Sequence, residues 1–282
     1  MVAAEVLPAE RPECALDGTR RLGGQNRPVR TLLVIGIGMG SPDDLTVQAI
    51  VALNRVDVFF VIDKGDATKE LVELRTAICD RHIDSADYRV VQVPDAERDR
   101  TSPGYETAVR DWHQERALRC EQAIADELPD GGCGGFLVWG DPALYDSTIR
   151  VIESIRQRGR IDLDYQVVPG ISSVQALAAG HRIVLNGIGE PVLITTGRRL
   201  TEALDSGAEN IVVMLDGGLA CSRLEPADGW RIYWGAYLGT PDEVLVAGPL
   251  AEVIGQIRDV RAELKERKGW IMDTYLLRRS AD

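Results

Sequence analysis

The chain has 282 residues, 45% of them hydrophobic, which is enough to build two domains that each bury a core. A formal net charge of −12 and a pI near 4.8 argue against a nucleic-acid backbone or an anionic membrane surface as the main partner, because the long-range field repels both. The five cysteines are never spaced as CxxC, so they suggest neither a disulfide framework nor a zinc site. With no apolar run of about 18 residues and no signal-peptide pattern, we expect a cytoplasmic protein without a membrane span.

Residues 1–30 mix proline, glutamate, arginine and glycine without periodicity, and we expect them to form a disordered N-terminal extension. From residue 31 onward, apolar strand-like runs alternate with helical patterns. The expected strands cover residues 31–38, 58–63, 89–94 and 135–140. The expected helices cover residues 45–56 and 68–82, much of 95–128, and 143–159. This alternation predicts a parallel α/β sheet with crossover helices.

A polar, glycine-containing stretch, "RQRGRID" at residues 156–162, is where we place a domain boundary. It divides the chain into an N-terminal α/β domain, residues 31–158, and a C-terminal α/β domain, residues 159–282. In the second domain the expected strands cover residues 165–170, 191–197, 210–215, 230–239 and 242–250. The expected helices cover residues 172–180, 199–206 and 249–267.

The stretch "VIGIGMGSPDDLT", residues 34–46, runs from a strand through three glycines into a helix start. A dinucleotide fingerprint needs a third glycine where this chain has Ser41. The Asp43–Asp44 pair that follows would repel a pyrophosphate at the helix N-terminus, so the loop suits a neutral or cationic ligand such as a sulfonium. Asp63 closes the next strand, as it would in a dinucleotide-binding domain, and this alternative therefore stays open.

Two later stretches also join a strand to a helix through turn residues. They are "VWGDPALYDS", residues 138–147, and "VVPGISSVQALAAG", residues 167–180. Ligands of open α/β sheets bind at the carboxyl ends of strands, which is where both stretches fall. Turn chemistry alone would also account for each of them.

Together, and in this order, the three stretches resemble the tetrapyrrole (corrin/porphyrin) methyltransferase family, over residues 31 to the end. The family pattern is a GxGxG loop followed by LT, then GDPxxY, then VxPGxSS. The resemblance implies a class III-type fold of two α/β domains with the active site in the cleft between them. It also implies S-adenosylmethionine as methyl donor, a tetrapyrrole substrate, no metal, and a homodimer. Many members have a proline where this chain has Met39.

Site residues follow from the same resemblance. The donor is expected along Trp139, Gly140, Asp141, Leu144, Ser172, Ser173, Met214, Ala236, Gly248 and Pro249. Whether Met214 or its neighbour Leu215 faces the donor is left open. The tetrapyrrole and its carboxylates are expected to contact Gly38, Met39, Gly40, Tyr105, Arg116 and Arg198.

Methyl transfer to an electron-rich carbon needs in-line geometry and exclusion of water rather than a metal or a covalent intermediate. An accompanying hydrolytic step would need a general base and an oxyanion donor. Asp63, His113 and Tyr145 are the candidates, with helix capping, surface exposure and packing as their respective alternative roles. Two other functions stay open: methylation without hydrolysis, and a non-catalytic dinucleotide-binding regulator.

Overall fold

The computed structural model describes residues 29–63, 69–85, 87–96, 105–225 and 229–279, with the side chains of 63, 69–72 and 105–110 left out. The predicted extension, residues 1–30, lies almost wholly outside this part of the chain. The described residues form two compact α/β units that meet in the chain at Gly170, and the short loop Gly38–Asp44 belongs to the second. Two α/β units were predicted, and the prediction is confirmed.

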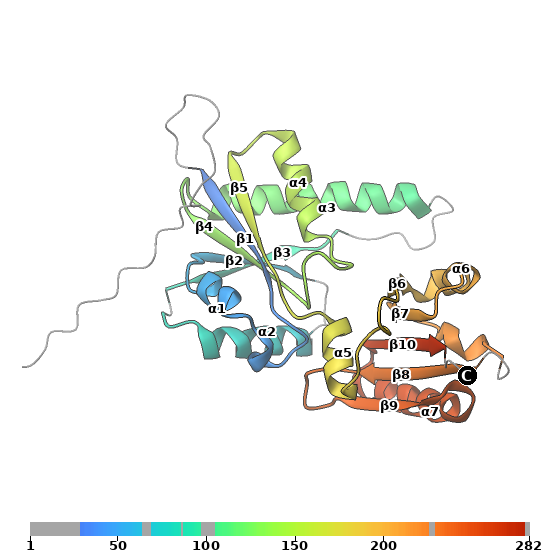
Figure 1. Ribbon diagram of the computed structural model, residues 1–282. Coiled ribbons are helices and arrows are strands. Elements are labelled where there is room, and N and C mark those ends of the chain that lie inside the picture. Colours follow the sequence, from blue (N-terminus) through green and yellow to red (C-terminus); the bar gives the residue numbers. More distant parts are fainter. Residues whose placement is uncertain (1–28, 64–68, 86, 97–104, 226–228, 280–282) are drawn as a thin grey trace, which may run out of the picture. The chain divides into compact units, whose positions relative to one another are not determined.

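The first unit is built on a five-stranded sheet in which every pair of neighbours is parallel (Figure 1). In spatial order its strands are β3 (Arg89–Pro94), β2 (Val58–Asp63), β4 (Cys133–Val138), β1 (Arg30–Gly36) and β5 (Leu163–Val168). Its helices are α1 (Val47–Leu53), α2 (Lys69–His82), α3 (Tyr105–Glu127) and α4 (Thr148–Arg158). The parallel sheet with crossover helices is therefore as predicted.

Central strand β1 shows why the sheet is covered on both faces. Leu32 and Val34 pack with residues of α3 and α4, while Leu33 and Ile35 pack with residues of α1 and α2. Side chains alternate across a strand, so a strand between two helical layers reads as a continuous apolar run. That is the origin of the sequence "TLLVIG".

The predicted boundary between residues 158 and 159 is displaced, because β5 belongs to the first sheet. Its residues pair with β1 from Arg30↔Leu163 to Ile35↔Val168. The polar stretch that suggested a boundary is the end of α4 and its turn, where Gly159 adopts a left-handed φ of 62°. A helix end and a domain end carry the same turn residues, so composition alone does not separate them.

The second unit contains a mixed five-stranded sheet. In spatial order its strands are β6 (Leu193–Thr196), β7 (Asn210–Met214), β10 (Asp273–Arg279), β8 (Trp230–Ala236) and β9 (Val244–Pro249). Only β6 and β7 run parallel, and the other neighbours are antiparallel. The helical segments are α5 (Ser173–His181), η3 (Gly197–Arg199), α6 (Leu200–Asp205), η4 (Ala220–Arg223) and α7 (Leu250–Lys268). No helix in the described ranges is long and apolar enough to cross a membrane.

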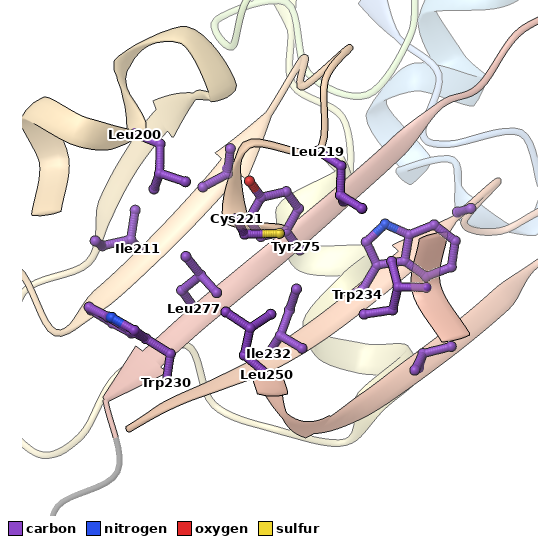
Figure 2. Packing of buried hydrophobic residues seen from close by; sticks show 14 of the residues in the cluster. Leu200, Ile211, Leu219, Cys221, Trp230, Ile232, Trp234, Leu250, Tyr275 and Leu277 are labelled. Carbon is purple, nitrogen blue, oxygen red and sulfur yellow. The ribbon is translucent and has the colours of Figure 1, made fainter. Parts of the chain in front are cut away.

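The core of the second unit lies between one face of this sheet and helices α6 and α7 (Figure 2). Tyr275 and Leu277 of β10 point into it together with Ile211, Ile232 and Trp234 from the flanking strands. Strand β10 was not among the predicted strands, although it is central. Leu276 is also fully buried, so both faces of β10 are covered and its sequence shows no polar and apolar alternation to detect.

Gly255, on the exposed side of α7, offers a stabilising substitution. A Cβ added there has no heavy atom within 4 Å, and the residue lies inside the helix. Glycine is less favourable than alanine in a helix interior, so Gly255→Ala should raise the free energy of unfolding by about 0.5–1 kcal/mol. Urea unfolding measures this change, and a loss of stability would mean that the local helix is not as described.

Candidate functional site

Three glycines from separate stretches meet at the carboxyl ends of β1, β4 and β5. A Cβ added to Gly36 would lie 2.6 Å from the backbone nitrogen of Gly170, and one added to Gly170 would lie 2.2 Å from the carbonyl oxygen of Gly140. The three backbones therefore approach more closely than any other residue permits. The glycine loop, the GDP turn and the PGISS turn therefore converge, whereas the sequence had placed the strand before the PGISS turn in the second domain. Gly36 itself was not among the expected site residues, although its motif was.

Asp141 fixes two of these turns to one another. Its Oδ1 accepts the backbone N–H of Ala143 at 2.8 Å, and its Oδ2 accepts the backbone N–H of Gly170 at 2.9 Å. The carboxylate thus closes the GDP turn and links it to the strand end of β5. Both of its oxygens are engaged with backbone, so its role is to position the turn.

We expect Asp141→Ala to loosen the turn and to weaken binding of the methyl donor that the family resemblance implies. Both backbone donors lose their acceptor, which costs about 1–3 kcal/mol of stability for each that stays buried and unpaired. Calorimetric titration with S-adenosylhomocysteine and urea unfolding measure the two effects. Asp259→Ala, on the exposed face of α7, is the control. Unchanged donor affinity together with unchanged stability would contradict this role.

The rest of the GDP stretch is a turn, whereas the sequence suggested a helix from residue 143. Helix α4 begins only at Thr148, after Tyr145 has adopted a left-handed φ of 55°. Left-handed backbone at a bulky residue is strained, and such strain concentrates at functional sites. The Tyr145 side chain is 44% exposed, while Trp139 and Leu144 are half-buried.

The first glycine loop does not lead directly into a helix as a dinucleotide fingerprint requires. Ser41 accepts the backbone N–H of Asp43 in a single 3₁₀ turn, and α1 begins later, capped by Thr46. The sequence predicted a helix start in this stretch, and the 3₁₀ turn found there is separate from α1. This geometry and the two acids disfavour a pyrophosphate site.

Within the second unit, the loop Gly38–Asp44 packs against the turn that follows β8. A Cβ added to Gly239 would lie 2.7 Å from Oδ2 of Asp44 and 3.6 Å from Cβ of Met39. Burial and the neighbouring acids Asp43 and Glu243 raise the pKa of Asp44. Met39 is 5% exposed, and Gly38 and Gly40 are also buried.

Ser172 and Ser173 are both engaged in hydrogen bonds that hold α5. Ser172 caps the helix by accepting the backbone N–H of Val174, and Gln175 completes a capping box. Thr274 of β10 donates its hydroxyl to Ser173 Oγ at 3.1 Å. The paired serines therefore place α5 beside the start of β10.

One end of the second sheet gathers several expected residues. Met214 at the end of β7 pairs with Thr274, and Ala236 at the end of β8 pairs with Asp273. Arg198 follows β6 at this same end and is exposed. Leu215, directly after Met214, has a left-handed φ of 52° and is 65% exposed. An apolar side chain thus lies in solvent on strained backbone just beyond the strand.

Gly248 and Pro249 were expected in the same pocket, and the strand directions contradict this. Strand β9 runs antiparallel to β8, so its carboxyl end pairs with Arg231 at the start of β8. Ala236 pairs with Val244 instead, five strand residues away from the Arg231↔Pro249 pair, or about 17 Å at the rise of an extended strand. The expectation came from the family resemblance, which carries no information on the direction of β9.

Arg116 was expected to bind a carboxylate of the substrate, but the structure pairs it internally. Its guanidinium donates to both oxygens of Asp95, from Nε at 2.8 Å and from Nη2 at 2.5 Å. Nη1 donates to Ser147 Oγ at 3.0 Å, and the group lies 3.8 Å from the ring centroid of Trp112. Because Arg116 is 3% exposed and its donors are engaged, it positions the chain before α4.

The three catalytic candidates lie on different elements. Asp63 ends β2, and its side chain lies outside the described residues. The same holds for the side chain of Tyr105, an expected substrate contact at the start of α3. His113, on α3, is half-buried with its ring centroid 4.7 Å from that of Trp112.

The described residues were considered as metal ligands and as thiol nucleophiles from their grouping and their pKa values. They include no group of three or more His, Cys, Asp or Glu side chains able to hold a metal ion. Burial raises the pKa of Cys79 to about 11 and the pKa of Cys120 and of Cys221 to about 12. These thiols therefore stay protonated near neutral pH and are poor nucleophiles.

The three stretches that together resemble one family in sequence thus lie at one edge of the first sheet. The model of the tetrapyrrole (corrin/porphyrin) methylases matches residues 31–254, so the chain belongs to that family. The predicted family is confirmed.

Individual members of the family show which proteins this chain is similar to. The chain is 49% identical over 254 residues to a precorrin-6A synthase (deacetylating) of Sinorhizobium sp., covering 90% of this chain and 97% of that one. Among solved structures, a cobalamin synthesis related protein (CobF) of Corynebacterium diphtheriae is 42% identical, with a TM-score of 0.77 over 89% of this chain and 99% of that one. Cobalt precorrin-4 methyltransferase (CbiF) shares the fold at 18% identity, with a TM-score of 0.61 over 88% of this chain and 94% of that one.

Proposed function

We propose that this protein methylates C1 of precorrin-5 in cobalamin (corrin) biosynthesis and releases the acetyl group as acetate, to give precorrin-6A. The observation that carries the proposal is 49% identity, over nearly the full length of both chains, to a relative named as the deacetylating synthase. The convergence of Gly36, Gly140 and Gly170 supports it, because the three family motifs form one structural feature.

The donor S-adenosylmethionine would supply a methyl group on a sulfonium. In the first unit we propose the turn from Trp139 to Leu144 as its contact, and in the second unit Ser172, Ser173, Met214 and Ala236. Left-handed backbone at Tyr145, in the turn before α4, and at Leu215, directly after β7, supports this proposal, because such strain concentrates at functional sites. Gly248 and Pro249 are left out of this set because of their position at the opposite end of the sheet.

Deacetylation requires water to attack the acetyl carbonyl while the bond from that carbonyl to the ring breaks. The electron pair of that bond returns to the ring system, and acetate leaves. We propose Asp63 as the group that takes the proton from water, with His113 and Tyr145 as further candidates for proton transfer and oxyanion stabilisation. The strand end at Asp63, paired with Pro94 in the parallel sheet, supports this placement.

Several finer points of the proposal come from the sequence alone. We propose that the tetrapyrrole contacts Gly38, Met39, Gly40, Tyr105 and Arg198, and that the enzyme works in the cytoplasm as a homodimer without a metal. Sedimentation of the purified protein measures its oligomeric state.

The function is tested by incubating the protein anaerobically with precorrin-5 and S-adenosylmethionine. Methylation accompanied by acetate supports the proposal, and Asp63→Asn should then bind donor but release acetate slowly. Wild-type acetate release by that variant would remove Asp63 as the base. Methylation without acetate would instead favour a family member that does not deacetylate.

A further inference from the structure

Two buried hydrogen-bond donors beside the GDP turn have no acceptor among the residues that the structure describes. They are Nε of Arg75, on α2, and the indole Nε1 of Trp139, directly after β4. The Arg75 guanidinium carbon lies 5.5 Å from the centroid of the Trp139 ring, so the two side chains are neighbours in the first unit. Buried polar side-chain atoms are nearly always hydrogen-bonded, so two neighbouring exceptions need an explanation.

Neither group satisfies the other, because guanidinium and indole N–H groups are donors only. The acid that acts on Arg75 is Asp146, and its Oδ1 already accepts the backbone N–H of Thr148 at 2.6 Å. Burial lowers the pKa of Arg75, and Asp146 offsets this only in part. A half-buried cation in this position would be stabilised by an added anion.

Arg116 shows the contrast within the same unit. Its guanidinium is bound by both oxygens of Asp95 and by Ser147, which leaves it engaged internally. Arg75 also lies beside the turn at the strand ends, whereas its Nε has no such acceptor. Of these two arginines, Arg75 is the one equipped to take a ligand.

We propose that Arg75 and Trp139 together bind a carboxylate carried by one of the two reactants. A carboxylate has two acceptor oxygens, one for each donor, and charge-assisted hydrogen bonds to arginine are the stronger kind. The proposal rests on the proposed function, because both reactants carry carboxylates: the tetrapyrrole on its side chains and the methyl donor on its methionyl group.

The test compares Arg75→Gln, Trp139→Phe and the double variant with the wild type. Arg81→Gln, an exposed arginine on the same helix, is the matched control. S-adenosylhomocysteine affinity is measured by calorimetry, and the KM of the tetrapyrrole and kcat are measured under anaerobic turnover. Thermal unfolding shows whether each variant keeps its fold.

We expect Arg75→Gln to weaken one of the two ligands roughly 10- to 100-fold, and Trp139→Phe to weaken the same ligand about 3- to 10-fold. The double variant should lose less than the product of the two, because both donors serve one carboxylate. A raised KM with unchanged S-adenosylhomocysteine affinity assigns the carboxylate to the tetrapyrrole, and weaker S-adenosylhomocysteine binding assigns it to the donor.

Folded Arg75→Gln protein that keeps both affinities, like Arg81→Gln, would overturn the inference and leave the proposed function intact. Multiplicative losses in the double variant would also overturn it, because the two donors would then act separately. If the wild type transfers no methyl group, the proposed function fails. The affinity for S-adenosylhomocysteine, measured by calorimetry, still shows whether Arg75 binds the carboxylate of the donor.

Discussion

Gly170→Ala should abolish most methyl transfer, with a fall of about 100-fold or more in kcat/KM. The added Cβ would lie 2.2 Å from the carbonyl oxygen of Gly140 and 2.8 Å from Cα of Gly36. All of these neighbours are backbone atoms, so no side-chain rotation relieves the collision, and a strand end must move. A shift of about 1 Å near a reacting centre can cost 100-fold in rate.

The same substitution should lower the free energy of unfolding by about 1–3 kcal/mol, which is the usual cost of overpacking. Gly255→Ala adds the same atom where no heavy atom lies within 4 Å, and it serves as the control. Turnover assays and urea unfolding measure both effects. A Gly170→Ala variant with wild-type turnover would show that this close approach of three backbones is not needed for activity.

Arg116→Ala should destabilise the first unit by about 3–5 kcal/mol, because removing one partner leaves a partly buried charge on Asp95. The side chains of Arg116 and Asp95 are 4% and 18% exposed, and the pair is bidentate. Arg199→Ala breaks an exposed pair with Glu202, whose side chains are 71% and 65% exposed, and should cost at most about 1 kcal/mol.

Urea unfolding of Arg116→Ala, Asp95→Ala and the double variant measures the coupling between the two side chains. We expect the double variant to be less destabilised than the sum of the single variants, since removing both charges leaves neither unpaired. Additive losses would contradict a direct pair. If Arg116→Lys raises the KM of the tetrapyrrole without any loss of stability, the original expectation that Arg116 binds substrate would be restored.

Much of the first unit could be predicted because its strands are parallel and covered on both faces. Each apolar run was followed by a helix, so the carboxyl ends of β1 and β4 were expected at one edge, and the turns at Gly36 and Gly140 meet there. The turn at Gly170 joins them only because β5 belongs to this sheet, which the sequence did not predict. Sequence order alone carries this information in a parallel sheet.

The second unit was less predictable because its sheet is mixed. Strand β10 lies last in the chain but in the middle of the sheet, and its buried residues do not alternate with polar ones. The antiparallel pairing of β8 and β9 then places Pro249 far from Ala236, which a list of motifs cannot show.

Single arginines were the hardest to assign from sequence. The helical pattern around Arg116 does not predict its partner Asp95, because the two residues lie far apart in the sequence and come together only in the folded chain. Likewise, Arg75 stands in an ordinary amphipathic helix, and its unsatisfied Nε beside Trp139 becomes visible only in three dimensions. The sequence shows how many arginines could bind a ligand, but it does not show which of them already pair with an acid in the fold.

Acetate formation during anaerobic turnover with precorrin-5 and S-adenosylmethionine tests the central claim most directly. We predict one acetate for each methyl group transferred, with S-adenosylhomocysteine formed in equal amount. Methylated product without acetate, or no methylation while the protein is folded and binds the donor, would contradict the claim.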